Sequence, residues 1–321
     1  MTFERTVVMA TVVFSVTPAL ALTSMPRRGA LQLGAAGLLA GPVVLPGQAL
    51  VPPAIQPLTL PPMGIGAWAW GDSLFWGYNP KNDFELRELF DYVAATPNAF
   101  FDTAELYGLG RSEVLLGDFE KASGKKVAIA SKFAALPWKT TRKDVVSACE
   151  ASLRRMGREQ MELYQIHFPN AWANEAYWDG LGDCYERGLV KAVGVSNYGA
   201  DAVTATSEAL GARGIPLYSN QIQYSLLYPF ANQNGLKQRC DELGVKVLAY
   251  SPLGLGLLSG KYNRERLPEG PRAQLAKAFF EDDAEVAGRL VAAVQTAAEK
   301  HGGTPSQVAI NCAHAPHSTL R

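Results

Sequence analysis

The most informative part of the chain reads Phe100-Phe-Asp-Thr-Ala-Glu-Leu-Tyr-Gly-Leu-Gly-Arg-Ser-Glu-Val-Leu-Leu-Gly117. It begins with a short apolar run of the length of a buried strand, and the run ends at an acid, Asp102. Tyr107 follows five residues later in a Gly-rich turn, and a helix is predicted from Ser112 onward. This order indicates a strand, a loop suited to proton chemistry and a helix. The alternative is a surface acid and a tyrosine that only packs.

The same order of elements repeats along the chain from Leu58 onward. Apolar runs predict strands at 63–68, 99–102, 127–132, 162–167, 192–196, 218–223 and 245–250. Amphipathic segments predict helices between them, at 83–95, 112–121, 143–156, 175–187, 200–210 and 233–243. Strands that alternate with helices indicate repeated βαβ units and a parallel sheet.

Two α/β architectures fit this alternation, the open doubly wound sheet and the closed (β/α)8 TIM barrel. The open sheet that binds dinucleotides carries GxGxxG after its first strand, but Gly64-Ile-Gly66 lacks the third glycine. A nearer match, Gly254-Leu-Gly-Leu-Leu-Ser-Gly260, follows the seventh predicted strand instead. Polar residues fall at the C-terminal ends of successive strands: Asp102, Lys132, His167, Ser196, Asn197, Gln221, Tyr250 and Ser251. Because such ends all converge on one mouth only in a barrel, we predict the TIM barrel.

Asp102, Tyr107, Lys132 and His167 form one candidate catalytic set. The phenol of tyrosine is a poor acid at neutral pH, with a pKa of about 10, and the ammonium group of Lys132 is expected to lower that pKa. Asp102 would hold Lys132 in place, and His167 would donate a hydrogen bond to a carbonyl oxygen. Such a set can protonate an oxygen while a hydride reaches the carbonyl carbon. Taken singly, each residue also has a structural explanation, such as a turn cap or a core histidine.

Several motifs resemble the aldo/keto reductase family, and they occur in order between about Leu58 and Asn311. They are Phe101-Asp-Thr-Ala-Glu-Leu-Tyr-Gly-Leu-Gly-Arg-Ser-Glu113, Ala130-Ser-Lys-Phe-Ala-Ala-Leu-Pro-Trp138, Leu163-Tyr-Gln-Ile-His-Phe-Pro169, Gly188-Leu-Val-Lys-Ala-Val-Gly-Val-Ser-Asn197 and Leu248-Ala-Tyr-Ser-Pro-Leu253. The opening Gly64-Ile-Gly-Ala-Trp-Ala-Trp-Gly-Asp72 resembles the plant chloroplast members in particular. The resemblance implies a (β/α)8 barrel that reduces small aldehydes or ketones with NADPH, with NADH as the alternative cofactor.

The resemblance also implies a role for each site residue. Tyr107 would be the general acid, tuned by Lys132 and Asp102, while His167 orients the carbonyl. The implied cofactor-binding residues are Ser196, Asn197 and Gln221 at the nicotinamide carboxamide, Tyr250 at its ring, and Ser251, Leu253, Gly254, Gly256 and Ser259 at the pyrophosphate. Glycines there would let the backbone approach a phosphate closely. The loops near the mouth predict an apolar substrate wall, with core packing as the alternative, from Trp68, Trp70, Trp138 and Phe168.

The N-terminal residues 1–50 have the character of a targeting leader. An apolar run at 7–14 precedes Ala19-Leu-Ala21, which together form the parts of a secretory signal. Arg27-Arg28 then precede a Gly-, Ala- and Leu-rich run at 29–45, as in a twin-arginine signal. Neither run is long or continuous enough to span a bilayer. The arrangement resembles the leaders of algal plastid proteins and predicts the plastid, including its thylakoid lumen, with secretion as the alternative.

After the leader we predict a Pro-rich linker at 51–57 and a barrel domain at 58–321. The segment that begins at Gly303 predicts a helix with Thr304 as its N-cap. Beyond residue 311 the chain has neither the apolar eighth strand nor the eighth helix that the resemblance implies. In the family this unit holds the adenosine end of the cofactor, so the barrel is expected to be incomplete. The alternatives to an enzyme are a nucleotide-binding redox sensor and an inactive truncated product.

Composition narrows the classes of partner. Thirty basic and thirty acidic residues cancel, and no basic patch indicates nucleic acid. A hydrophobic content of 48% with 19% charged residues indicates a large globular core. The four cysteines form no CxxC pair and predict buried free thiols, without a disulfide framework or a metal site: Cys149, Cys184, Cys240 and Cys312. The expected partner is a small carbonyl substrate, and the sequence does not indicate an oligomeric state.

Overall fold

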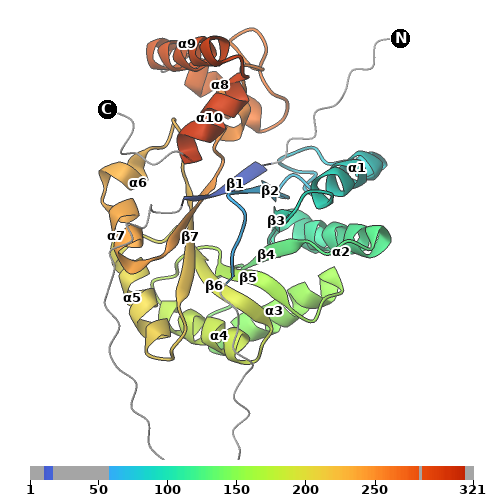
Figure 1. Cartoon of the computed structure of the whole chain (residues 1–321), viewed down its shortest axis with the longest axis vertical. Coiled ribbons are helices and arrows are strands. Elements are labelled where there is room, and N and C mark those ends of the chain that lie inside the picture. Colours follow the sequence, from blue (N-terminus) through green and yellow to red (C-terminus); the bar gives the residue numbers. More distant parts are fainter. Residues whose placement is uncertain (1–10, 17–57, 282–283, 315–321) are drawn as a thin grey trace, which may run out of the picture.

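The computed structural model of the protein describes residues 11–16, 58–281 and 284–314, and its main feature is a parallel β-barrel (Figure 1). Seven consecutive parallel strands form most of the wall: β2 (Met63–Gly66), β3 (Phe100–Asp102), β4 (Ala128–Phe133), β5 (Met161–Ile166), β6 (Val190–Ser196), β7 (Leu217–Gln223) and β8 (Lys246–Tyr250). Each strand pairs with the next in sequence order. The predicted α/β barrel is therefore confirmed.

Helices connect the strands and cover the outside of the barrel (Figure 1). They are α1 (Asp83–Ala94), α2 (Arg111–Ser123), α3 (Arg142–Met156), α4 (Asn174–Glu186), α5 (Ala200–Gly211), α6 (Phe230–Gln233) and α7 (Leu236–Leu243). Short 3-10 turns lie at Pro80–Asn82, Tyr107–Gly110 and Gly254–Ser259. The predicted helices agree with these bounds to within a few residues. The prediction succeeds because apolar residues recur in these segments at the helical period.

An additional strand, β1 (Thr11–Val16), closes the sheet between β2 and β8. It runs antiparallel to both neighbours, with Thr11 opposite Gly66 and Phe14 opposite Ala249. No eighth parallel strand follows β8 within the described residues, and β1 occupies the position that such a strand would take. The barrel that was expected to be incomplete is therefore closed. β1 also lies inside the predicted leader. The rest of the leader and the predicted linker fall outside the described residues, and the leader itself stays a prediction.

Three more helices follow β8: α8 (Arg272–Glu281), α9 (Ala284–His301) and α10 (Pro305–His314). The start of α10 is as predicted, because the Thr304 hydroxyl oxygen accepts a hydrogen bond of 3.2 Å from the Gln307 backbone N–H. The sequence analysis does not predict α8 and α9. The inner face of α9 carries mainly small residues, Ala287, Val294 and Ala298, and small side chains give only a weak periodic signal.

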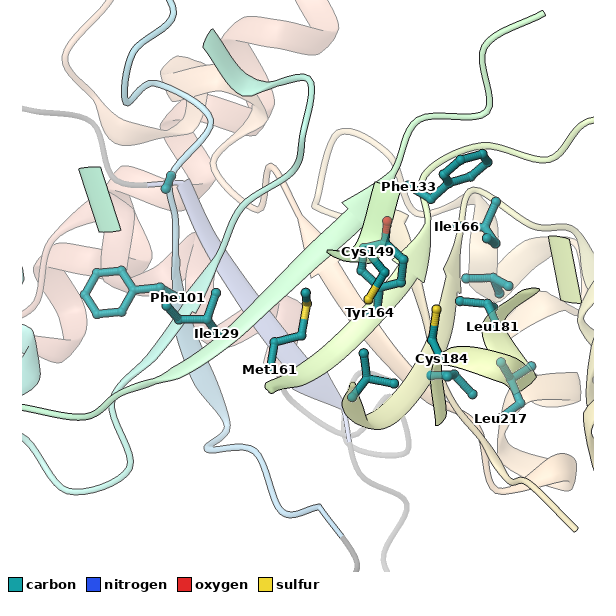
Figure 2. Packing of buried hydrophobic residues seen from close by; sticks show 14 of the residues in the cluster. Phe101, Ile129, Phe133, Cys149, Met161, Tyr164, Ile166, Leu181, Cys184 and Leu217 are labelled. Carbon is teal, nitrogen blue, oxygen red and sulfur yellow. The ribbon is translucent and has the colours of Figure 1, made fainter. Parts of the chain in front are cut away.

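The principal core lies between the barrel wall and the surrounding helices (Figure 2). Phe101 and Ile129 from the strands contribute to it, as do Cys149 of α3 and Cys184 of α4. A smaller cluster, which includes Phe100 and Ala130, fills the barrel interior. Successive strand residues point to opposite faces, so the residue two positions after an interior residue also points inward.

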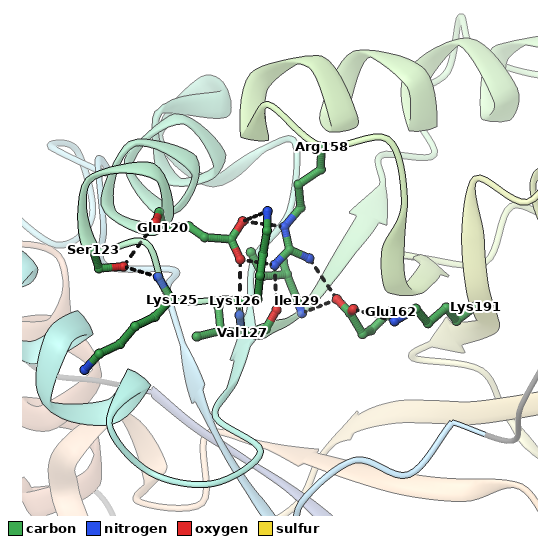
Figure 3. Close-up of polar contacts among 9 residues, drawn as sticks. All are labelled: Glu120, Ser123, Lys125, Lys126, Val127, Ile129, Arg158, Glu162 and Lys191. Carbon is green, nitrogen blue, oxygen red and sulfur yellow. Dashed lines mark hydrogen bonds and ion pairs between the residues drawn. The ribbon is translucent and has the colours of Figure 1, made fainter.

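A network of buried charges joins elements at the N-terminal ends of the strands (Figure 3). Arg158, only 6% exposed at its side chain, donates from Nε to Glu120 Oε2 at 2.8 Å and from Nη1 to Glu162 Oε2 at 2.8 Å. Its Nη2 also donates to the Val127 carbonyl oxygen at 2.5 Å. Lys191 adds a further contact to Glu162, at 3.1 Å. One guanidinium group therefore connects the end of α2 with the starts of β4 and β5.

The findings on membranes, metals and thiols concern the described residues only, and most of the two apolar runs at 7–14 and 29–45 lies outside them. None of the helices in this part of the chain has the length and apolar character that crossing a bilayer requires. In the same residues, no group of three or more His, Cys, Asp or Glu side chains is arranged to hold a metal ion. All four cysteines are free, and three are buried as predicted, whereas Cys312 is half-buried.

Candidate active site

The C-terminal ends of the strands enclose a cavity of about 270 Å³ at the mouth of the barrel. Its lining residues come from six strands and the loops that follow them. They are Gly66, Trp68, Asp102, Leu106, Tyr107, His167, Phe168, Ser196, Asn197, Gln221, Tyr250 and Ser251. The structure therefore brings together strand ends that lie far apart in the sequence. Leu106 and Gly66 belong to this lining although the sequence analysis did not select them.

Lys132 lies behind the cavity lining with a fully buried side chain, bonded to the lining residues Asp102 and Tyr107. Its ammonium donates to Asp102 Oδ2 at 2.6 Å, to the Thr103 carbonyl oxygen at 2.8 Å and to Tyr107 Oη at 3.3 Å. Burial lowers the pKa of Lys132, but its contacts with Asp102 and Tyr107 outweigh burial and raise that pKa above its usual value. Asp102 also accepts a hydrogen bond of 2.8 Å from Gln221 Nε2. Lys132 is therefore an ammonium ion held in one position.

Tyr107 starts the 3-10 turn after β3, and its ring faces the ammonium of Lys132 at 4.9 Å from the ring centroid. Burial raises the pKa of Tyr107 above its ordinary value, and the charge of Lys132 only opposes this effect. Lys132 therefore lowers the pKa of the phenol as expected, but loss of water contact is the larger effect, so this pKa lies above its ordinary value. At neutral pH the phenol keeps its proton.

His167 follows β5 and is 8% exposed. Burial and the nearby charge of Lys132 lower the pKa of His167 well below its usual value, so the imidazole is neutral at neutral pH. Its ring stacks on Phe168 at a centroid distance of 4.2 Å and meets Tyr107 edge-on at 5.7 Å. Its Nδ1 is buried and has no hydrogen-bond partner among the described residues.

A further part of the cavity lining is a hydrogen-bonded polar group from β6, β7 and β8. The Ser196 hydroxyl donates to the Gln221 carbonyl oxygen at 2.8 Å, and the Tyr250 hydroxyl donates to Asn197 Oδ1 at 2.9 Å. Asn197 and Ser251 have positive φ values of 62° and 52°. This backbone conformation is strained for residues other than glycine and is concentrated at functional sites. Hydrogen bonds therefore link the predicted carboxamide-binding residues Ser196, Asn197 and Gln221 to one another.

The predicted pyrophosphate loop lies farther along the chain, at Gly254–Ser259. Leu253, Gly254, Gly256 and Ser259 do not line the cavity described above. Gly254 has a φ of +55°, and a Cβ placed there would lie 2.4 Å from Cδ1 of Leu227. The left-handed backbone at position 254 favours glycine, and a Cβ there would also require the Leu227 side chain to move. The role of the loop in holding a phosphate stays a prediction.

Two of the four aromatic residues predicted for the substrate wall line the cavity, namely Trp68 and Phe168. Trp70 is a wrong prediction, because its fully buried ring packs in the core, 5.7 Å from the ring of Phe101. Trp138 is also wrong, because it is 74% exposed and lies outside the cavity lining. Both occupy irregular segments, where no strand period predicts the direction of a side chain.

Glu105 lies outside the cavity lining but holds the loop that carries Tyr107, and the sequence analysis missed it. Its carboxylate accepts a hydrogen bond of 2.6 Å from the Ala134 backbone N–H and pairs with Lys139 at 2.9 Å. These contacts connect the loop that carries Tyr107 to the segment that follows β4. In the sequence, the only indication of its importance is that an acid stands two residues before Tyr107. The contacts of Glu105 with Ala134 and Lys139 depend on the fold and cannot be read from the sequence.

The sequence of the chain matches a protein-family model over residues 62–316, that of the aldo/keto reductase family. The chain belongs to the aldo/keto reductase family. It is 44% identical to a chloroplastic pyridoxal reductase from Arabidopsis thaliana over 273 residues, which cover 79% of this chain and 73% of that protein. Membership of this family makes the protein an oxidoreductase.

Solved structures of the family share the fold. A glycerol dehydrogenase from Gluconobacter oxydans is 26% identical with a TM-score of 0.65, and the match covers 76% of each chain. An aldo/keto reductase from Klebsiella pneumoniae in complex with NADP and acetate is 20% identical with a TM-score of 0.57, over 76% of this chain and 74% of that one. The chain described here therefore shares its barrel architecture with proteins to which it has low sequence identity.

Proposed function

We propose that this aldo/keto reductase reduces aldehydes or ketones to alcohols with NADPH, using Tyr107 as the general acid. The observation that carries the proposal is the buried ammonium of Lys132, which lies 2.6 Å from Asp102 and 3.3 Å from the Tyr107 phenol oxygen. This arrangement places a protonated phenol of the cavity lining beside a fixed positive charge. A sensor that only binds a nucleotide would not need this proton donor.

The polar side of the cavity supports a nicotinamide cofactor. Ser196, Asn197 and Gln221 present hydroxyl and amide groups that suit a planar carboxamide, and Tyr250 adds a partly exposed ring beside them. NADPH, when bound, supplies the hydride that reduces the carbonyl carbon. The Klebsiella pneumoniae structure with NADP supports this choice of cofactor by the shared fold.

The residues of this chain then control the proton. Tyr107 donates its phenolic proton to the carbonyl oxygen as negative charge develops there. The ammonium of Lys132 stabilises the phenolate that is left, and Asp102 keeps that ammonium in place. His167 is neutral, so it can donate one N–H to the same carbonyl oxygen and orient it.

The substrate is a small carbonyl compound, and pyridoxal is the first candidate to test, because the Arabidopsis thaliana relative is a pyridoxal reductase. The same relative is chloroplastic, which supports a plastid location for this protein. Both points rest on similarity over 79% of the chain.

The test is NADPH oxidation, followed by absorbance, with pyridoxal and a panel of aromatic and aliphatic aldehydes. We expect Tyr107→Phe to lower kcat about 10²- to 10⁴-fold, since it removes the proton donor and leaves the ring. Tyr92→Phe is the matched control, because this phenol is 77% exposed on α1 and should be dispensable.

Equal rates for the native protein and Tyr107→Phe would show that the acid role is wrongly assigned. NADPH binding, detected by fluorescence quenching, without turnover of any aldehyde would instead favour the nucleotide-sensor alternative. Replacing NADPH with NADH in the same assay determines the cofactor preference.

A further inference from the structure

The cavity lining carries few charged groups. Among the described residues, Asp102 is the one acid in the lining, and its carboxylate is already paired with Lys132 and bonded to Gln221. No Lys or Arg lines the cavity in the part of the chain that the structure describes. His167 is neutral. A negatively charged ligand would therefore find no unpaired cation among these residues.

Lys132 lies behind the lining, and its ammonium is already bound by Asp102, the Thr103 carbonyl oxygen and Tyr107. Two further cations lie on segments near the cavity, and both have other contacts. Lys139, on the segment after β4, pairs with Glu105 at 2.9 Å. The guanidinium of Arg272, in α8, lies 4.7 Å from the ring centroid of Trp76. Neither side chain reaches the cavity lining. The nearby positive charge is therefore already engaged by groups of the protein itself.

The wall next to the proton donor is apolar and firmly packed. Trp68 stacks on Phe75 at 5.1 Å with an interplanar angle of 8°, and it meets Trp76 edge-on at 5.3 Å. Its ring also lies 6.1 Å from that of Tyr107. Leu106 complements this wall from the loop after β3. A flat, uncharged group fits beside these surfaces and displaces water from them.

We propose that the site selects uncharged aromatic or apolar aldehydes and discriminates against aldehydes that carry a carboxylate or phosphate. A carboxylate in this cavity would lose its water without gaining a cationic partner, which is strongly unfavourable. The inference rests on the proposed carbonyl reductase function. It identifies Leu106 and Phe168 as positions at which charge selection can be changed.

The test compares kcat/KM for methyl 4-formylbenzoate and for 4-formylbenzoate, which differ in the charge opposite the aldehyde and in one methyl group. We expect the native protein to prefer the neutral ester at least about tenfold. In Leu106→Lys we expect this preference to shrink about tenfold relative to Leu106→Met, mainly through a lower KM for the carboxylate. Lysine and methionine are unbranched side chains of similar length, and comparison of the variants cancels the different reactivities of the two aldehydes.

Several results would overturn the inference. One is equal kcat/KM for ester and carboxylate in the native protein, and another is the same ratio in the Lys and Met variants. If Leu106→Lys does not fold, as judged by circular dichroism, Phe168→Lys and Phe168→Met repeat the comparison at a side chain that is 44% exposed. Failure of the native protein to reduce any aldehyde would overturn the proposed function, and with it the inference.

Discussion

At the scale of single residues, the Asp102 carboxylate sets the protonation of its neighbours. It accepts hydrogen bonds from Lys132 at 2.6 Å and from Gln221 at 2.8 Å. The pair keeps Lys132 charged despite complete burial, and the charge of Lys132 in turn contributes to the lowered pKa of His167. A protonated phenol, an ammonium and a neutral imidazole therefore coexist at neutral pH around one cavity.

The lowered pKa of His167 predicts a specific dependence of stability on pH. Burial and Lys132 depress this pKa well below its ordinary value of about 6.5. Below about pH 6.5 the unfolded chain binds a proton at His167, whereas the folded chain binds one only when the pH falls through the lowered pKa. Because the unfolded state binds more protons in this window, the free energy of unfolding decreases as the pH falls.

We expect His167→Gln to remove this part of the acid destabilisation. Urea unfolding at about pH 7.5 and about pH 5 should show a smaller decrease in the free energy of unfolding for the variant than for the native protein. His301→Gln, at an exposed position near the end of α9, controls for the loss of one histidine. If His167→Gln and the native protein lose the same free energy, His167 is not held neutral by the fold.

The sequence predicted some site residues better than others for a physical reason. Asp102 and Lys132 lie at strand ends, two residues after interior residues of the same strands, so the alternation of side chains fixes their direction. Trp70 and Trp138 lie in irregular segments that lack such a period. The direction of the pKa shift of Tyr107 also depended on how much water the fold removes from the phenol, which the sequence does not show.

At the scale of elements, the contacts of Arg158 predict a large and local effect on stability. Replacing it with Met leaves the Glu120 carboxylate, which is 4% exposed, without its buried partner. Breaking a buried ion pair from one side typically destabilises a protein by about 3–5 kcal/mol. We expect Arg158→Met to lower the free energy of unfolding by about that amount, measured by urea denaturation.

A matched exposed pair provides the control for Arg158. Arg187 pairs with Glu150, and their side chains are 50% and 35% exposed, so Arg187→Met should change the free energy of unfolding by about 1 kcal/mol or less. The Arg158 network lies at the N-terminal ends of the strands, away from the cavity, so kcat/KM of the folded variant should stay unchanged. Equal effects of the two substitutions would contradict the structural role given to Arg158.

The helices differ in how clearly the sequence pattern predicts them. α1 to α5 carry large apolar residues on the buried face, such as Leu86 and Phe90 in α1. These residues recur clearly at the helical period in the sequence. α9 buries small residues against α8 and the segment after β8, so its pattern is weak even though the helix spans 18 residues. The Thr304 cap, by contrast, is a local signal and was predicted correctly.

At the scale of the whole molecule, the barrel closes with a strand that no local signal could assign to it. The apolar run at 7–14 has the composition of a leader, and composition alone does not show that 11–16 pairs with strands distant in sequence. Closure is a property of the sheet, since β2 and β8 would otherwise each present an unpaired edge. The sequence thus predicts seven of the eight positions in the barrel wall by their βαβ repetition.

This arrangement gives residues 11–16 two competing roles, and truncation separates them. A chain that begins at residue 17 lacks β1, whereas a chain that begins at residue 11 keeps it and serves as the control. Loss of β1 removes its ladders to β2 and β8, in which each hydrogen bond contributes about 1 kcal/mol. We therefore expect the free energy of unfolding to fall by several kcal/mol in the shorter chain only.

The exposed edges should also promote self-association, seen by light scattering. If the two chains are equally stable and equally monodisperse, β1 contributes nothing to the barrel, and the role of 11–16 is confined to the predicted leader.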